Sequence, residues 1–109
     1  MKRTDAMQGS IDLLVMKILA RQGPLHGYGI TSRIQAMSDN VLRVEEGSLY
    51  PALHRMEESG WIKAEWKVTD NRRRARLYEL TPAGVKQLAD AEERWTNITA
   101  AVARVLRLA

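Results

Sequence analysis

Cysteine is absent from this 109-residue sequence, and histidine occurs only twice, as His26 and His54. Without cysteine the chain can form neither disulfide bonds nor thiolate metal sites, which fits a reducing compartment. No Ser/His/Asp set, metal-ligand spacing or phosphate-binding loop can be assembled around two histidines on different expected elements. Glu57 and Glu58 are adjacent, so their carboxylates diverge on a helix. We therefore expect no enzyme active site, no metal site and no cofactor.

Long apolar runs are also missing. No stretch approaches the roughly 18 apolar residues that suggest a membrane span, and residues 1–9 lack the apolar core of a signal peptide. No repeat, linker or low-complexity tract is visible. Hydrophobic residues make up 45% of the chain and charged residues 28%, which is ordinary for one soluble domain. We expect a cytoplasmic protein without a membrane partner.

Positive charge is concentrated in one fifth of the sequence. Residues 61–81 contain six basic side chains and three acidic ones, which is +3 of the formal net charge of +4. The basic residues are Lys63, Lys67, Arg72, Arg73, Arg74 and Arg76. An isolated charge cluster is usually a solvated face, but this one follows a helix closely, which favours a polyanionic partner.

Two core-facing helices are expected in the first third of the chain. Ser10 is a plausible N-cap for the first, which ends at Gly23-Pro24. Its apolar stripe is Ile11, Leu14, Val15, Ile18 and Leu19. The second is expected from about residue 27 to residue 37, with Ile30, Ile34 and Met37 on its inner face. Its entry, residues 25–29, is rich in glycine, which permits close backbone packing or a tight turn.

A third helix is the most informative part of the sequence. After a short β-prone run at residues 41–44, residues 46–60 predict an amphipathic helix that Ser48 can cap, with Pro51 in its first turn. Its inner face would be Leu49, Ala52, Leu53 and Met56. Its outer face would be Pro51, His54, Arg55 and Glu58, with Tyr50 at the border.

Two strands and a long helix are expected in the second half. Residues 61–68 and 74–80 alternate with period two, and the turn between them, residues 69–74, carries arginines. Thr81-Pro82 opens a helix that runs to about residue 107. We expect residues 1–81 to form one compact unit with the helix of residues 82–109.

The last helix has an apolar surface broader than a small domain should expose. It consists of Val85, Leu88, Trp95, Ile98, Val102, Val105, Leu106 and Leu108. A second copy of the chain would cover it in a helix-to-helix dimer, with Leu88, Trp95, Ile98, Val102 and Val105 at the interface. A helix folded back within a monomer is the alternative.

The order of elements predicts a mostly α-helical fold with a small β-hairpin, namely a winged helix-turn-helix with a long C-terminal dimerisation helix. A recognition helix reads base edges in the major groove while neighbouring groups hold phosphates. Ser48, Tyr50, Pro51, His54 and Arg55 would supply that surface. The arginine tip, Arg72, Arg73 and Arg74, would follow the flanking backbone or enter a minor groove. A two-fold dimer would bind a palindromic site in double-stranded DNA.

Four segments resemble the PadR family of bacterial transcriptional regulators, in its short form. They are residues 23–30, 46–57, 60–62 and 76–84. The resemblance implies a winged-helix dimer joined through the C-terminal helix, usually a repressor, with DNA contacts from Ser48, Tyr50, Pro51 and the arginine wing. Leu77 departs from the aromatic residue often found there. The large C-terminal helical domain of longer members is not seen, so dimerisation is expected to use the helix from Pro82 and the N-terminal helix.

The resemblance also suggests an effector. Some relatives bind planar hydrophobic compounds and release DNA, and Trp95 could line such a pocket for a small aromatic or hydrophobic molecule. Dimer packing is the simpler role for Trp95. We expect a homodimeric, sequence-specific transcriptional repressor. A winged helix used only for protein–protein interaction and a small-molecule sensor without a DNA target are the alternatives.

Overall fold

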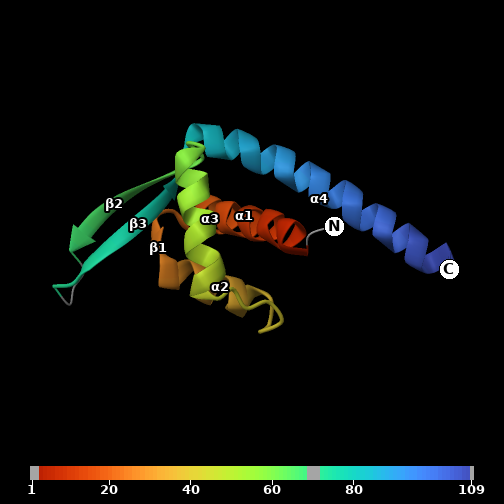
Figure 1. The fold of residues 1–109 in the computed structure, drawn as a ribbon, viewed down its shortest axis with the longest axis horizontal. Helices are drawn as coiled ribbons and strands as arrows, with labels where there is room; N and C mark the ends of the chain where they lie inside the picture. The colour runs from red at the N-terminus through yellow and green to blue at the C-terminus, as the bar shows by residue number, and fades with distance from the viewer. Residues whose placement is uncertain (1–2, 69–71, 109) are drawn as a thin grey trace.

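Four helices and one three-stranded sheet make up the part of the chain that the structure describes, residues 3–68 and 72–108 of a computed structural model (Figure 1). In chain order they are α1 (Arg3–Gln22), β1 (Leu25–His26), α2 (Gly27–Met37), α3 (Glu46–Glu58), β2 (Ile62–Val68), β3 (Arg74–Leu80) and α4 (Pro82–Leu108). The expected fold class, a winged helix with a long C-terminal helix, is confirmed.

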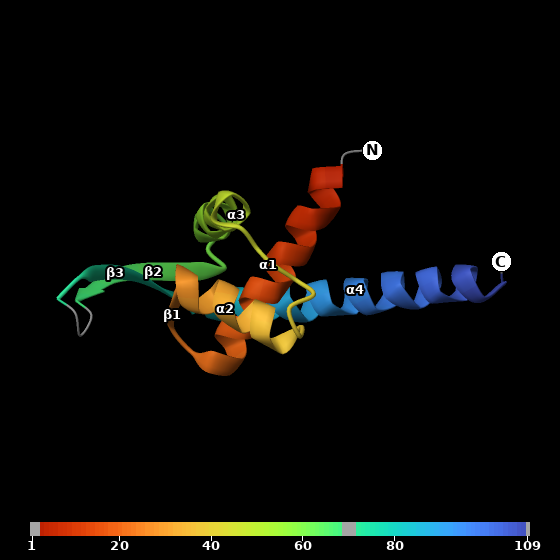
Figure 2. The ribbon, with the colours of Figure 1, turned by 90° about the horizontal axis from the view of Figure 1, so that it is seen from below.

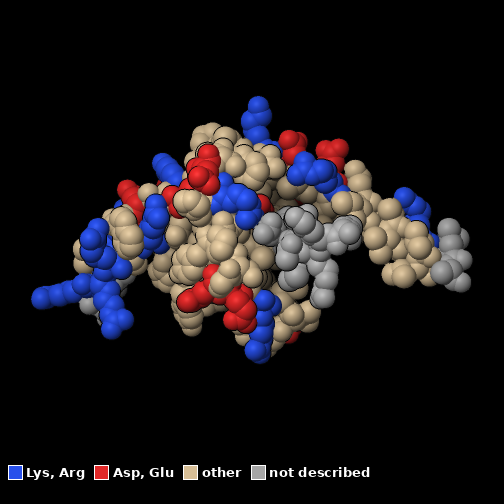
Figure 3. All heavy atoms as spheres, in the orientation of Figure 1, with Lys and Arg blue, Asp and Glu red and all other residues tan. Residues whose placement is uncertain are grey.

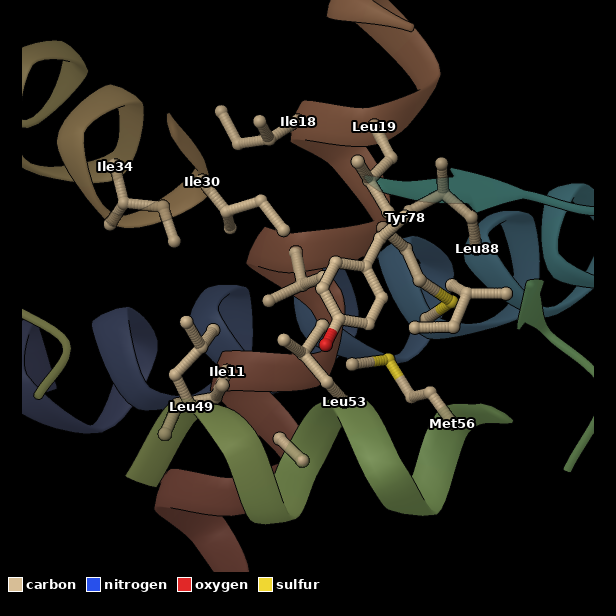
Figure 4. Packing of buried hydrophobic residues seen from close by; sticks show 14 residues of the cluster. Ile11, Ile18, Leu19, Ile30, Ile34, Leu49, Leu53, Met56, Tyr78 and Leu88 are labelled. Atoms are coloured by element: carbon tan, nitrogen blue, oxygen red, sulfur yellow. The ribbon is translucent and has the colours of Figure 1, made fainter. Parts of the chain in front are cut away.

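The core lies where α1, α2 and α3 meet the base of the hairpin. The predicted inner face of α3 is confirmed, since Leu49, Ala52, Leu53 and Met56 are all buried. Figure 4 shows Leu53 and Met56 pointing from α3 toward Tyr78 of β3. On α2, Ile30 and Ile34 are buried as expected. Met37 is 56% exposed, because α2 ends there and the last turn projects beyond the core.

The sheet has one strand more than the sequence predicted. The hairpin β2–β3 is antiparallel from the pair Ile62–Leu80 to the pair Val68–Arg74, as expected. β1 pairs with the other edge of β3, giving the order β1-β3-β2. A two-residue strand has no readable periodicity, so only the tertiary fold reveals it. The β-prone run at residues 41–44 forms no strand, because no sheet edge receives it.

Two helix starts differ from the sequence predictions. α1 begins at Arg3, so Ser10 lies inside the helix and is not its N-cap. α3 begins at Glu46 with Glu45 in the capping position, which places Ser48 third in the helix and Pro51 in its second turn. The start of α4 agrees with expectation, because the Oγ1 of Thr81 accepts a hydrogen bond from the Gly84 N–H at 3.0 Å.

Only the first half of α4 packs on the rest of the chain. Leu88 is buried in the core of the protomer itself, at 6% exposure, and is therefore not part of the exposed apolar face expected at a dimer interface. The Nζ of Lys17 in α1 lies 3.1 Å from Oε1 of Glu92. Beyond this point α4 extends away from the body (Figures 1 and 2). None of the described helices is long and apolar enough to cross a membrane.

Candidate nucleic-acid interface

The outer face of α3 is a continuous exposed row. Gly47, Pro51, His54 and Glu58 follow one another at i, i+4, i+7 and i+11, the spacing of residues on one face of a helix, and all four are exposed. The Nε2 of His54 lies 3.6 Å from Oε1 of Glu58. Since both side chains are largely in solvent, this contact contributes little to stability and can open for another partner.

Arg55 is not directed outward as the sequence suggested. Its Nη2 donates a hydrogen bond of 2.6 Å to Oδ1 of Asp12 in α1. The Asp12 side chain is only 17% exposed. Burial raises the pKa of Asp12 above its usual value of 3.8, and Arg55 lowers the pKa only in part. The guanidinium of Arg55 therefore joins α3 to α1, which limits what it can offer to DNA.

The opposite flank of α3 is joined to the hairpin. The Nη2 of Arg76 in β3 donates a hydrogen bond of 2.9 Å to Oε2 of Glu57. The Arg76 guanidinium also lies 5.9 Å from the ring centroids of Trp66 and Tyr78, within cation–π range. Its Nε is buried and finds no hydrogen-bond partner among the described residues. These contacts set the position of the hairpin relative to α3.

Arginines gather at the far end of the hairpin. Arg72, Arg73 and Arg74 are all exposed, and Figure 3 shows the basic cluster that they form there. The guanidinium of Arg74 lies 5.1 Å from the centroid of Trp66. The first part of the expected turn, residues 69–71, lies outside the described residues. In the described part of the tip, the exposed arginines thus form a cationic surface, and Arg74 lies over the ring of Trp66.

A groove of about 540 Å³ lies between the hairpin and the starts of α2 and α3. It is lined by His26, Gly27, Tyr28, Tyr50, Trp66, Arg73, Arg74, Ala75, Arg76 and Tyr78. Only Tyr50, Arg73 and Arg74 of these were expected in a DNA site. The glycine-rich entry to α2 was the signal that could have pointed to Tyr28, which is 76% exposed.

The residues at the start of α2 form one wall of this groove. The Nδ1 of His26 accepts a hydrogen bond from the Gly29 N–H at 3.2 Å, which caps α2. The Tyr50 hydroxyl packs against Gly27, where a Cβ would lie 2.6 Å from the oxygen. Glycine at position 27 thus lets Tyr50 bridge from α3 to α2, and the two helices present a single surface.

A second cavity of about 440 Å³ lies on the other flank of α3, between α1, α4 and the segment before α3. Its lining is mainly apolar and consists of Ser10, Ile11, Leu14, Leu42, Arg43, Val44, Glu45, Ser48 and Trp95. The sequence pointed to Trp95 but not to its neighbours, which come from three distant segments. Within residues 3–68 and 72–108, no cluster of His, Asp and Glu could hold a metal ion.

Comparison with known proteins identifies a family. Residues 15–90 match the Transcriptional regulator PadR-like family. The transcriptional regulator Rv3488 of Mycobacterium tuberculosis is 41% identical over 71 residues, which cover 65% of this chain and 63% of the relative. The match thus spans less than two thirds of that relative's length.

Solved structures share the fold. A transcriptional regulator from Clostridium thermocellum superposes with a TM-score of 0.82 at 27% identity, covering 92% of this chain and 96% of the other. Bacillus subtilis PadR, solved in complex with operator DNA, has a TM-score of 0.65 at 25% identity, covering 73% of this chain and 45% of PadR. The name of that protein describes it as a negative transcriptional regulator.

Proposed function

Because the chain belongs to the PadR-like family of transcriptional regulators, which are not enzymes, we propose that it is a homodimeric repressor that binds a specific operator. It would act in the bacterial cytoplasm on double-stranded DNA. The structure of the Bacillus subtilis relative with its operator, and that relative's description as a negative regulator, support the proposal.

The observation that carries the proposal is the placement of two surfaces around one groove. The exposed face of α3 lies on one side and the arginine tip on the other, with Tyr50 and Arg74 both lining the groove between them. Ser48, Pro51 and His54 would enter the major groove with Tyr50 beside the phosphates. The tip would hold the flanking backbone, which positions the helix without reading sequence.

Arg55 has a different role in this proposal. Its hydrogen bond to Asp12 holds the guanidinium toward α1, away from the outer row of α3 that would face the base edges. Arg55 would therefore hold α3 against α1, and base reading would depend on the outer row of α3. The tip residues Arg72, Arg73 and Arg74 would supply most of the phosphate contacts.

A homodimer would form through α4. The apolar residues that remain exposed on α4 are Val85, Trp95, Ile98, Val102, Val105 and Leu106. Most of them lie beyond the part of α4 that packs on the body, so a second copy of α4 is the simplest cover. A two-fold pair of this kind would present its two α3 helices to half-sites about 34–36 Å apart, or a multiple of this spacing.

Selection from random DNA tests the proposal. The full chain is incubated with a library of random duplexes, bound DNA is amplified, and the enriched sequences are read. We expect an enriched inverted repeat that gives a single retarded band containing two chains per duplex. A protein–protein adaptor or a sensor without a DNA target would enrich no sequence, and that result would overturn the proposal.

The apolar cavity beside Trp95 favours a second element of the function, release by a small planar hydrophobic effector. The cavity contacts Glu45 and Ser48, at the start of α3, so a ligand there would touch the segment that positions α3. A panel of planar aromatic compounds should quench or shift tryptophan fluorescence, and the signal should vanish in Trp95→Leu while the dimer persists. No response from any compound would count against an effector.

A further inference from the structure

Gly47 stands in the outer row of α3 with nothing packed against it. A Cβ built on this residue meets no atom of the chain within 4 Å. The residue is exposed and has helical conformation, which alanine would adopt without strain. Glycine in a helix is less favourable than alanine, since it loses more backbone freedom on folding. Nothing within the protomer therefore accounts for glycine at this position.

The other glycines from position 23 onward each have an internal reason or an internal neighbour. Two adopt positive φ, two would place a Cβ less than 3.0 Å from another atom, and the Cβ of Gly29 would make an ordinary contact of 3.4 Å with Leu25. The four constrained residues are Gly23, Gly60, Gly27 and Gly84. Gly47 differs from each of them, which indicates that its reason lies outside the chain.

The backbone at Gly47 also lacks one of the usual hydrogen bonds of a helix. Pro51 stands four residues later and has no N–H, so the carbonyl of Gly47 cannot receive the usual i+4 hydrogen bond of an α-helix. His54 continues the same row one turn further on. At Gly47 the outer row of α3 thus carries no side chain, whereas Pro51 and His54 continue the row with theirs.

We infer that Gly47 is the point where α3 comes closest to the base pairs of the operator. Glycine permits a backbone to approach a ligand more closely than any other residue. The N-terminal residues of a recognition helix are those that reach base edges in the major groove. A Cβ at position 47 would hold the helix away from the base edges but leave the phosphate contacts of the arginine tip available. The inference rests on the proposed DNA binding.

The test compares stability with two kinds of binding for Gly47→Ala and Gly47→Val. The probes are the duplex selected by the wild-type protein and a duplex of the same length with that site scrambled. For Gly47→Ala we expect an unchanged or higher melting temperature and a loss of affinity for the selected duplex on the order of tenfold, the scale of one mismatched base pair. Gly47→Val should lose more affinity for the selected duplex. Affinity for the scrambled duplex at low salt should be unchanged.

Ala83→Val is the control, because it also enlarges an exposed position in the first turn of a helix. Position 83 lies in α4, outside the groove and the outer row of α3, so both affinities should equal those of the wild type. The inference is overturned if Gly47→Ala binds the selected duplex as the wild type does. It is also overturned if both affinities fall together or if the variant does not fold. A wild-type protein that selects no sequence would instead overturn the proposed function.

Discussion

Arg55 of α3 and Asp12 of α1, 43 positions apart in the sequence, are joined by a hydrogen bond of 2.6 Å between Nη2 and Oδ1. The pair is half in the interior, with exposures of 38% for Arg55 and 17% for Asp12. The helix that carries the proposed recognition residues is thus attached to α1 by a charge pair. The same α1 helix is joined to α4 through Lys17 and Glu92, so α1 lies between the proposed DNA-reading and dimerisation helices.

Removing the arginine should destabilise the domain. Arg55→Ala leaves the mostly buried Asp12 carboxylate without its partner, which costs about 1–3 kcal/mol, and it should raise the pKa of Asp12 further because the lowering influence of Arg55 is lost. Urea unfolding measures the first effect and carboxylate NMR titration the second. The double variant Asp12→Ala/Arg55→Ala should lose less stability than the sum of the losses in the two single variants.

DNA binding separates the two roles of Arg55. If Arg55 holds α3 and touches no phosphate, Arg55→Ala should leave the slope of log K against log salt unchanged. A slope shallower by about 0.9 would indicate that Arg55 neutralises a phosphate and would contradict this role.

Unlike Arg55, the arginine tip should contribute to the salt dependence of DNA binding. Changing Arg72, Arg73 and Arg74 together to alanine should weaken binding to the selected and scrambled duplexes alike. The salt slope should become shallower by about 0.9 for each phosphate that the variant no longer neutralises. The melting temperature should hardly change, because all three side chains are exposed. Unaltered operator binding by the triple variant would exclude the proposed role of the tip.

The dimer should depend on the distal half of α4. Ile98→Glu places a charge in the exposed apolar face, and we expect a folded monomer by light scattering and weaker operator binding. Ala100→Glu is the control, because it introduces the same charge nearby but on the opposite face of α4, and it should remain dimeric. A dimer that survives Ile98→Glu unchanged would place the interface elsewhere.

Ionisation of Tyr78 should lower the free energy of unfolding at alkaline pH. Burial raises the pKa of its hydroxyl above the usual 10.0, although Arg76 lowers it in part. Above pH 10.0 the unfolded chain loses this proton first, so stability falls as pH rises until the folded pKa is passed. Urea midpoints of the wild type and Tyr78→Phe should diverge as the pH rises above 10.0, with the variant less affected. Parallel pH profiles would contradict this expectation.

The predictions that held share a local physical basis. The buried face of α3 follows from helical periodicity, the hairpin strands from alternation, and the start of α4 from the capping chemistry of Thr81 and Pro82. The predicted starts of α1 and α3 were wrong. Serine also occurs inside helices, so Ser10 and Ser48 did not mark a helix start.

The sequence by itself determined the winged-helix fold class and the outward position of Pro51, His54 and Glu58 on α3, since periodicity acts over a few residues. Only the tertiary structure decided that Arg55 turns to Asp12, that Leu88 belongs to the protomer core, and that β1 joins the sheet. These outcomes depend on which segments meet in space. A distant carboxylate, a packing partner or an open strand edge leaves no periodic signal in the residues that it will contact.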